Sequence, residues 1–477
     1  MSAMADKEKD IKNGARQEAQ EEVMSRLHGD KVIWAIFFLL SLISIALIYS
    51  ASSSLAYMKG STNFGILMKQ IRFVVLGIAA LFICYKVPPK WYRMFSMLSL
   101  LLAIVLLVLT LAIGVKTNDA QRWLSIGGIQ FQPTEFAKIA IVLYLARALE
   151  IMKIDTYKNF LIKIIAPIGV CIVLVLVGSV SAALYLALIC FIVLFLAGIK
   201  PSYLLKTIGL GAAGVILLIL LHLVSKPFTS EHRGIFPRMD TAIERFNRFF
   251  SNEDAVDVST LSKREQQRLA DETLQADMAQ IAVKEGGLLG KGPGKSTQRY
   301  VLPHPYSDYI YSIIIEEYGL WGGFLVMMLY VWFFYRCVLI VKGCRTVFSA
   351  VTAGGLGAVI LVQAMLHILV NVGIFPVTGH TLPLISLGGT SFVIISCAFG
   401  IILSISRTKE DAEAMILEKE RLEREQKRLE RERKKEEERK EAMAEQLKQD
   451  AMTQEERDEY LKQRYADQLG REEDELT

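Results

Sequence analysis

The sequence of 477 residues lacks the cysteine patterns of a disulfide-rich or cysteine-metal protein. Its six cysteines fall inside apolar runs or beside loops that we expect in the cytoplasm, and no Cys-x-x-Cys pair occurs. The segment 225–308, which we expect outside the cytoplasm, contains no cysteine. These absences exclude a disulfide framework in that segment and a cysteine metal centre, and they leave the cysteines as small apolar fillers.

A cleavable secretion signal is also missing. Residues 1–31 are polar and charged, and the first apolar run is too long for the apolar part of a signal peptide. What the chain has in abundance is apolar side chains, which make up 52% of its residues. They gather in runs of about 20 residues, the length of a helix that crosses a bilayer. The formal net charge of +5 sums soluble tails and membrane loops, and it indicates no nucleic-acid partner.

These runs predict an all-α polytopic membrane protein of about ten transmembrane helices. The runs cover residues 32–55, 67–85, 92–115, 134–150, 161–177, 180–198, 203–224, 309–340, 350–373 and 381–405. The fifth and sixth meet at Gly178-Ser179, so that connection is expected barely to leave the bilayer.

The distribution of basic residues predicts the orientation, because short cytoplasmic loops are enriched in Lys and Arg. One side has Lys86, Lys90, Arg93, Arg147, Lys153, Lys158, Lys163, Lys200, Lys206, Arg336, Lys342 and Arg345. The other side has only Lys59, Lys69, Arg72, Lys116 and Arg122. Both termini are therefore predicted in the cytoplasm, which makes 225–308 a large extracytoplasmic loop between helices seven and eight. This loop is too long to be a passive connector, and 262–285 is expected to be helical.

The chain is thus expected to have three parts: a cytoplasmic segment 1–31, a ten-helix membrane domain 32–406 and a charged cytoplasmic tail 407–477.

Within the tail, residues 409–442 are mostly Glu, Lys and Arg. Met415, Leu422 and Leu429 keep a seven-residue step, but Glu436 breaks it. We therefore predict a solvated helix with i,i+4 ion pairs rather than a coiled coil. Docking of a partner is the alternative.

Ionisable residues within membrane spans are candidates for function because burying them in lipid is costly. The first such cluster joins Arg122 and Trp123 to a helix start at Pro133, followed by Glu135 and Lys138 on one helix face. Two interpretations are open. Glu135 and Lys138 form a structural ion pair, or Lys138 and Arg122 face a cavity and bind phosphate while Glu135 orients them. Trp123 is also of the type that anchors a helix at headgroup depth.

The second cluster is a glycine-rich loop, 290–299, with Lys295, Ser296 and Gln298. Backbone N–H groups in such a loop can cradle phosphate, and the sharper interpretation is a contact with a lipid-linked diphosphate. The plainer interpretation is a flexible turn. The spacing is not that of a Walker A nucleotide loop.

In the third cluster Asp308 begins the eighth span, and Ser312 and Glu316 follow at four-residue steps. This spacing predicts that the three side chains share one helix face. A carboxylate at the mouth of an outward cavity is placed to act as a general base. The alternative is that Asp308 only caps the helix N-terminus.

In the fourth cluster Gln363, His367 and Asn371 repeat at four-residue steps along the ninth span. This stripe must face protein or a wet cavity, and a lone His367 is typically a hydrogen-bonded structural residue. The run that follows is rich in Gly, Pro and Ser and includes Thr378 and Ser386. It predicts irregular backbone that is buried in protein or lines a cavity.

In this order and on these spans, the clusters resemble the SEDS family of bacterial cell-wall polymerases, which includes FtsW, RodA and SpoVE. The resemblance covers roughly residues 32–406, and its most specific part runs from Asn371 to Ser391, similar to N-x-G…P-x-T-G…LP…S-x-G-G-[ST]-S. The other matching runs are Arg122-Trp123, Gln132-Pro133-Thr134-Glu135 with Lys138, Gly290-Lys291-Gly292 to Gln298, and Ser307-Asp308-Tyr309-Ile310 with Glu316-Glu317-Tyr318-Gly319.

The resemblance implies a peptidoglycan glycosyltransferase that polymerises lipid II at the outer leaflet, with a class B penicillin-binding protein as transpeptidase partner. The family's essential aspartate corresponds to Asp308. One motif departs from the family. Where many members carry Pro-Asp-Leu-Gly-Thr-Ala at the start of span six, this chain has Val177-Gly178-Ser179-Val180-Ser181-Ala182. The acidic residue is missing, so the resemblance assigns its role to no residue of this chain.

This departure and the start Gly29-Asp30-Lys31-Val32-Ile33-Trp34 favour the division type of the family, like FtsW, over the elongation type, like RodA. The expected location is the inner membrane at the division site, with other division proteins as partners.

Asp308 is the expected general base toward the acceptor hydroxyl. The residues expected to bind substrate are Arg122, Trp123, Glu135, Lys138, Lys295, Ser296, Gln298, Glu316, His367, Asn371, Thr378 and Ser386. Positive charge for the departing diphosphate would come from Arg122, Lys138, Lys295 or a divalent cation such as Mg²⁺ or Mn²⁺. No other cofactor is indicated.

Two other functions are weighed against this one. A flippase for the same lipid would place polar groups at the bilayer midplane and on both faces, whereas the marked residues crowd the outer side. A non-enzymatic division scaffold would not explain why the ionisable residues Glu135, Lys138 and His367 lie within the membrane.

Overall fold

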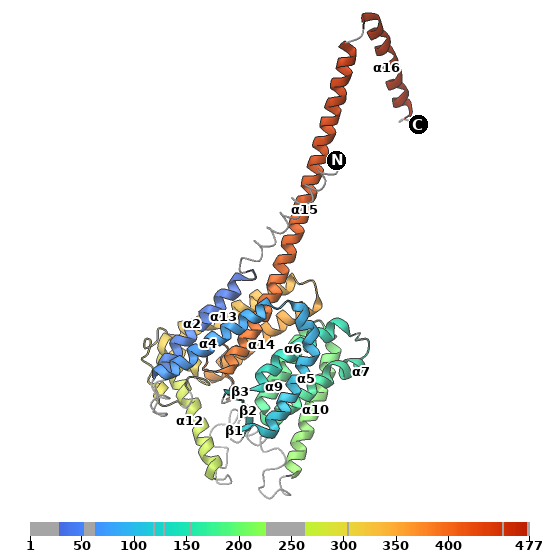
Figure 1. Cartoon of the computed structure of the whole chain (residues 1–477). Helices are drawn as coiled ribbons and strands as arrows, with labels where there is room; N and C mark the ends of the chain where they lie inside the picture. The colour runs from blue at the N-terminus through green and yellow to red at the C-terminus, as the bar shows by residue number, and fades with distance from the viewer. Residues whose placement is uncertain are drawn as a thin grey trace. The chain divides into compact units, whose positions relative to one another are not determined.

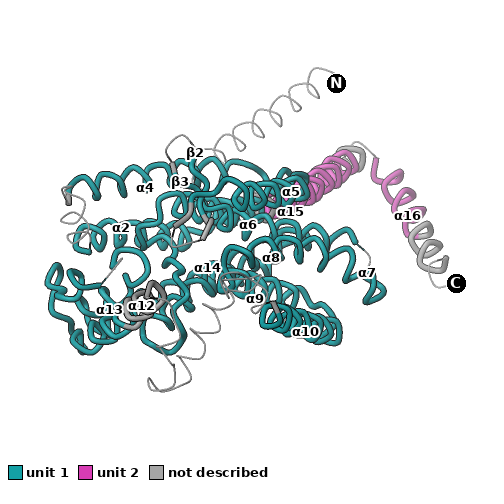
Figure 2. The backbone as a smooth tube through the Cα atoms, turned by 90° about the horizontal axis from the view of Figure 1, so that it is seen from below, with its two compact units in different colours: residues 1–410 teal, residues 411–477 magenta. Residues whose placement is uncertain are grey.

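The computed structural model describes residues 28–51, 63–117, 120–126, 129–152, 154–225, 263–302, 305–450 and 453–474 (Figure 1). Contacts divide the chain into two compact units, residues 1–410 and 411–477 (Figure 2). The first unit is a bundle of helices. Its helices in the first half of the chain are α2 (Lys31–Ala51), α4 (Asn63–Lys86), α5 (Pro89–Ile113), α6 (Pro133–Ile151), α7 (Tyr157–Phe160), the π-helix η1 (Leu161–Ile165), α8 (Ala166–Gly178), α9 (Val180–Leu196) and α10 (Pro201–Ser225).

The second half of the chain adds α12 (Lys263–Gly286), the short 3₁₀-helix η5 (Gln298–Tyr300), α13 (Ile310–Lys342), α14 (Val347–Asn371) and the first part of α15 (Thr390–Asp450) to this unit. The rest of α15 and α16 (Gln454–Asp474) belong to the second unit. The helix expected at 262–285 is confirmed as α12. The expected junction at Gly178-Ser179 is also confirmed. There α8 ends and α9 begins, and the Ser179 hydroxyl accepts a hydrogen bond from the N–H of Ala182 at 3.4 Å.

Eight helical segments among the described residues are long and apolar enough to cross a membrane, so the chain is a multi-pass membrane protein. One of the eight is the continuous run of α7, η1 and α8, Tyr157–Gly178. The apolar helix α9 is shorter, at 17 residues. The 19-residue helix α6 is less apolar because it carries Glu135, Lys138, Arg147 and Glu150. The expected count of ten spans and the placement of 225–308 outside the cytoplasm stay predictions.

The predicted helical membrane fold is confirmed, and one segment departs from it by forming a small antiparallel sheet between α5 and α6. Its strands are β1 (Val115–Thr117), β2 (Ala120–Ile126) and β3 (Ile129–Phe131), in the order β1-β2-β3. Leu124 pairs with Phe131 and Ile126 with Ile129. Apolar and polar side chains alternate over Leu124–Ile126 and Ile129–Phe131, the pattern of a half-exposed strand. These stretches are too short to be detected as apolar runs of membrane length.

The tenth expected span also starts later than predicted. Residues 381–389 form turns rather than helix, and α15 begins at Thr390. Pro383 lacks an N–H group, Leu384 adopts a positive φ of 62°, and Gly389 has a φ of 51°. Leu382 to Ser386 are nevertheless buried. This confirms the expectation of irregular backbone enclosed by protein.

Helix α14 is the centre of the first unit, packed against α6, α9 and α13. Its small residues permit close approach. Gly355 faces Val142 of α6 and Val193 of α9, so that an added Cβ would lie 2.7 Å from a Val142 methyl carbon. Because α14 touches all three neighbours, polar side chains on its predicted stripe can reach several elements at once.

Helix α13 is broken at Gly319, where φ is 73° and ψ is −177°. The carbonyls of Glu316 and Glu317 are released from the helix ladder and accept hydrogen bonds from the N–H groups of Lys291 and Gly292, both at 2.9 Å. A Cβ on Gly319 would lie 2.2 Å from the carbonyl oxygen of Leu288. The glycines therefore allow the loop after α12 to lie directly against the α13 backbone.

The second unit holds the charged part of α15 and α16. The expected i,i+4 ion pairs form, for instance Glu436–Lys440 at 3.1 Å and Arg428–Glu432 at 3.3 Å. Met415, Leu422 and Leu429 are all at least half exposed, at 71%, 50% and 50%. A solvated charged helix is thus confirmed.

Candidate active site

Asp308 lies in the turn that precedes α13, where its side chain is half-buried. Asn371, the last residue of α14, fixes this turn. Its Nδ2 donates to the carbonyl oxygen of Asp308 at 3.0 Å, and its Oδ1 accepts from the N–H of Ser312 at 3.1 Å. The helix start is therefore capped by Asn371 of another helix, and the Asp308 carboxylate is not needed as a cap.

The turn is fixed from a second direction by the irregular run before α15. Ser386 Oγ donates to the carbonyl of Ser307 at 2.8 Å, and the N–H of Leu387 donates to the carbonyl of Tyr306 at 2.9 Å. Burial, and then the neighbouring charge of Asp308, raise the pKa of Tyr306, so its phenol stays neutral. Asp308 is thus held by rigid backbone on both sides.

The carboxylate of Asp308 approaches a second turn, residues 378–381. A Cβ on Gly379 would lie 4.0 Å from Oδ2 of Asp308, and Gly379 has a φ of 67°, a conformation that favours glycine. Thr378 and His380, on either side of Gly379, line a cavity. The candidate base therefore lies beside the wall of that cavity.

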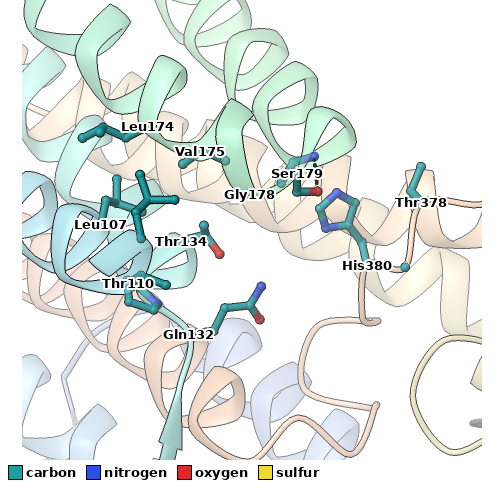
Figure 3. A pocket seen from close by; sticks show the side chains of 14 residues that line it. Leu107, Thr110, Gln132, Thr134, Leu174, Val175, Gly178, Ser179, Thr378 and His380 are labelled. Carbon is teal, nitrogen blue, oxygen red and sulfur yellow. Dashed lines mark hydrogen bonds between the residues drawn. The ribbon is translucent and has the colours of Figure 1, made fainter. Parts of the chain in front are cut away.

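This cavity, which we call cavity 1, has an empty volume of about 500 Å³, including space open to solvent. It lies between α5, the start of α6, the junction of α8 and α9, and the turn 378–381. Figure 3 shows apolar side chains, including Leu107 and Leu174, at one end and His380 and Thr378 at the other. The cavity is therefore amphipathic along its length.

A smaller space, cavity 2, is lined by the Glu135 and Lys138 pair, together with Tyr185 and His380. Lys138 Nζ donates to Oε1 of Glu135 at 2.8 Å and to Oε1 of Gln363 at 2.7 Å. Both ionic side chains are nearly fully buried, at 6% and 5% exposed. The expected i,i+3 ion pair is confirmed, and it also borders a cavity, so the two sequence interpretations are not exclusive.

The predicted stripe on α14 is buried and joins these parts. Gln363 accepts from Lys138 and donates its Nε2 to the carbonyl of Thr381 at 2.9 Å. Nδ1 of His367 lies 2.7 Å from the carbonyl of His380. Together with Asn371, the stripe connects α6, the turn 378–381 and the start of α13, which confirms that it faces protein.

Glu316 does not share a face with Asp308, because Asp308 precedes the first turn of α13. Instead the fully buried Glu316 carboxylate holds the glycine-rich loop. It accepts from Lys291 Nζ at 2.7 Å, from the N–H of Thr297 at 2.9 Å and from the hydroxyl of Ser296. The loop's N–H groups do cradle an anion, but that anion is a side chain of the protein itself.

Lys291 also pairs with the exposed Glu285 of α12. This hydrogen bond from Lys291 holds the pKa of Glu285 below its usual range. One lysine thus joins α12, the loop and α13.

The remaining expected site residues are more scattered. Lys295 is exposed, and Gln298 is half-buried with its N–H 3.4 Å from the Glu316 carboxylate. Trp123 is half-buried in β2, opposite Val115. The side chain of Arg122 lies outside the described residues.

Sequence reasoning missed His380 and Tyr185 as neighbours of the site. Their rings lie 5.1 Å apart, and Lys138 Nζ lies 5.2 Å from the Tyr185 ring centroid. Neither residue belongs to a polar stripe, so no spacing pattern marked them. Within the described residues no three His, Cys, Asp or Glu side chains gather as a metal site, and the expected Mg²⁺ or Mn²⁺ stays a prediction.

One family model matches most of the sequence of this chain. The model of the cell cycle proteins FtsW, RodA and SpoVE matches residues 30–411. The chain belongs to the FtsW/RodA/SpoVE family. The match spans the helices of the first unit, the cavities and the turn that carries Asp308.

Several relatives of this chain share most of its length. Stage V sporulation protein E of Bacillus subtilis is 28% identical over 79% of this chain and 97% of its own length. A probable peptidoglycan glycosyltransferase FtsW of Thioalkalivibrio sulfidiphilus is 29% identical over 82% and 94%. The peptidoglycan glycosyltransferase MrdB of Escherichia coli is 27% identical over 80% and 94%.

Solved structures share the fold. A chain of a peptidoglycan synthase complex has a TM-score of 0.59 at 22% identity, covering 80% of this chain and 98% of that one. The rod shape determining protein RodA of Thermus thermophilus has a TM-score of 0.56 at 20% identity, covering 80% and 97%. At these identities the similarity shows the architecture of the FtsW/RodA/SpoVE fold alone.

Proposed function

We propose that this chain is a peptidoglycan glycosyltransferase that polymerises lipid II at the outer leaflet of the inner membrane, with Asp308 as general base. The observation that carries the proposal is the position of the Asp308 carboxylate, against Gly379 at the wall of cavity 1. Relatives named as peptidoglycan glycosyltransferases align over most of the chain and support the same reaction class.

The amphipathic cavity suits a polyprenyl-linked sugar. Its apolar end, with Leu107 and Leu174, would take part of the lipid chain, and its polar end would take the diphosphate and sugar. Asp308 removes the proton from the acceptor hydroxyl as that oxygen bonds to the anomeric carbon of the donor. The bond from this carbon to the diphosphate oxygen breaks, and the diphosphate leaves with the electron pair. General base catalysis of this kind contributes about 10²–10⁴-fold.

We assign the chain to septal synthesis rather than to elongation, with a class B penicillin-binding protein and other division proteins as partners at the division site. Support comes from the sequence around residues 29–34 and from the altered start of α9. The chain similar in fold that belongs to a peptidoglycan synthase complex supports a transpeptidase partner. Depletion in the native host distinguishes the two roles: filamentous cells are expected, whereas rounded cells would indicate elongation.

The reaction is tested with purified full-length protein and lipid II, with and without a candidate transpeptidase. Asp308→Asn is expected to reduce glycan synthesis by at least about 10²-fold while leaving thermal unfolding unchanged. Asp277→Asn, which removes an exposed carboxylate from α12, is the matched control. Full activity of the Asp308 variant would disprove the role of the base.

The same assay separates the alternatives. Lipid II is supplied on the outside of liposomes. A flippase would not convert this lipid to a product, whereas a polymerase would build glycan from it. Normal growth of cells that carry only the Asp308 variant would favour a scaffold.

A further inference from the structure

His380 is a titratable side chain in both cavities that the proposed reaction has not yet used. Figure 3 shows its imidazole beside Ser179, directed from the turn 378–381 into cavity 1, with Thr134 and Gln132 on the facing side. Its ring also packs against Tyr185 at a tilt of 44°. The imidazole therefore lies among polar groups from three different elements.

The backbone that carries this imidazole is held firmly. The carbonyl of His380 lies 2.7 Å from Nδ1 of His367, the carbonyl of Thr381 accepts from Gln363 at 2.9 Å, and the carbonyl of Thr378 accepts from Ser181 at 3.4 Å. These contacts come from α14 and α9. A side chain presented from such a turn can bind a ligand with little loss of backbone freedom.

The electrostatics of the cavities favour an anion near His380. Lys138 is the one lysine or arginine among the described residues that line them, and it pairs with Glu135 at 2.8 Å. The helices α6 and α9 both begin at cavity 1, through Thr134 and Ser179, so two positive helix ends meet there. His380 lines the same cavity, and its imidazole is a group that can gain a positive charge.

On the basis of the proposed function, we propose that His380 binds the diphosphate of the lipid-linked donor by donating an imidazole N–H to a phosphate oxygen. Its protonated form then stabilises the negative charge that the diphosphate gains when the bond to the sugar breaks. The acceptor proton still goes to Asp308, so the two residues serve opposite ends of the transfer. A Cβ on Gly379 would lie 4.0 Å from Oδ2 of Asp308, and His380 is the next residue, so the two groups lie near the same turn.

Binding is measured without turnover, using full-length Asp308→Asn protein in lipid nanodiscs and lipid II as the probe. Adding His380→Gln or His380→Asn is expected to weaken binding about 10-fold, the size of a charge-assisted hydrogen bond. His28→Gln in the same background is the control, because His28 lines neither cavity. Thermal unfolding of every variant is recorded.

The pH dependence of lipid II binding distinguishes the contribution of the His380 imidazole from that of the other titratable groups. The other titratable groups around it are Tyr185, Glu135 and Lys138 in cavity 2, His367 at its backbone and Asp308, which the background removes. Between about pH 6 and 8, affinity should fall as the imidazole loses its proton, and this fall should be smaller in both His380 variants. Undecaprenol, which lacks phosphate, should bind all variants equally.

Weaker lipid II binding at an unchanged melting temperature supports the proposal. Equal affinity in the His380 variants would overturn it while leaving the glycosyltransferase proposal intact. A loss of affinity that accompanies a lowered melting temperature in both variants would also overturn it, as a purely structural effect. Failure of the parent protein to bind lipid II would instead contradict the proposed function, and this inference with it.

Discussion

Asn371 holds Asp308 by the backbone and not by the carboxylate. Its side-chain amide donates to the carbonyl oxygen of Asp308 at 3.0 Å and to that of His367 at 2.9 Å, while its Oδ1 accepts from Ser312. Asn371 thus positions the candidate base through its backbone carbonyl. Since Asn371 is fully buried, this arrangement depends on the packing of α14 against α13.

Replacing Asn371 by Ala should therefore misplace Asp308. We expect kcat for glycan synthesis to fall about 10²-fold, the cost of roughly 1 Å of misalignment, with a smaller change in KM. The buried hydrogen bonds that are lost should also lower the free energy of unfolding by about 1–3 kcal/mol. Steady-state kinetics and thermal unfolding measure the two effects. Asn159→Ala in α7 is the control, and a rate equal to wild type would show that Asn371 does not position the base.

The buried pair of Glu135 and Lys138 should contribute to stability as a unit. Lys138→Met leaves the Glu135 carboxylate buried without its ion-pair partner, and this should cost about 3–5 kcal/mol. Glu135→Gln combined with Lys138→Met should recover most of that loss, because no charge then remains buried. Thermal unfolding of the single and double variants forms a double-mutant cycle. Additive losses in that cycle would argue against coupling of the two side chains.

Gly319 should be intolerant of any side chain. Its φ of 73° and the carbonyl of Leu288 at 2.2 Å from an added Cβ mean that Gly319→Ala must displace backbone. We expect the free energy of unfolding to fall by about 3 kcal/mol from the backbone strain, and the clash with Leu288 should add to this loss. Gly214→Ala in α10 is the matched control. Nothing lies within 4 Å of its added Cβ, so the change should be neutral or stabilising by about 1 kcal/mol. Equal melting temperatures for the two variants would contradict the predicted clash.

Glu316 should keep the glycine-rich loop closed against α13. Glu316→Gln removes the charge that binds Lys291 and the N–H of Thr297, so amide hydrogen exchange at 291–298 should accelerate about 10-fold or more. Glu285→Gln removes only the exposed partner of Lys291 and should have a small effect. If the two variants exchange alike, the loop is held by the backbone bonds to α13 and not by Glu316.

Features carried by one element could be predicted from the sequence. Helix geometry places residues three or four apart on one face, which is why the Glu135–Lys138 pair and the stripe from Gln363 to Asn371 were found by spacing. Apolar runs of about 20 residues predicted the membrane helices, because the length of such a run is also a property of one element. Pro383 and the glycines around it predicted that the chain there would be irregular, although the expected helix start at 381 was nine residues too early.

Features that join elements could not be predicted in this way. The spacing of Asp308 and Glu316 suggested one shared face, but Asp308 lies before the helix and Glu316 binds a loop from α12. His380 has no partner at a regular spacing, and only the folding of 378–381 against α14 and α9 brings it into the cavities.

The sequence by itself determined that this chain is an apolar multi-helix protein with polar residues concentrated in a few segments, because hydrophobicity and helical spacing are local properties. Tertiary structure decided which of those residues meet. Asp308 reaches the cavity wall only because Asn371 and Ser386, far away in the chain, fix its turn. Such contacts depend on how helices pack, and packing depends on the shapes of all the side chains between them.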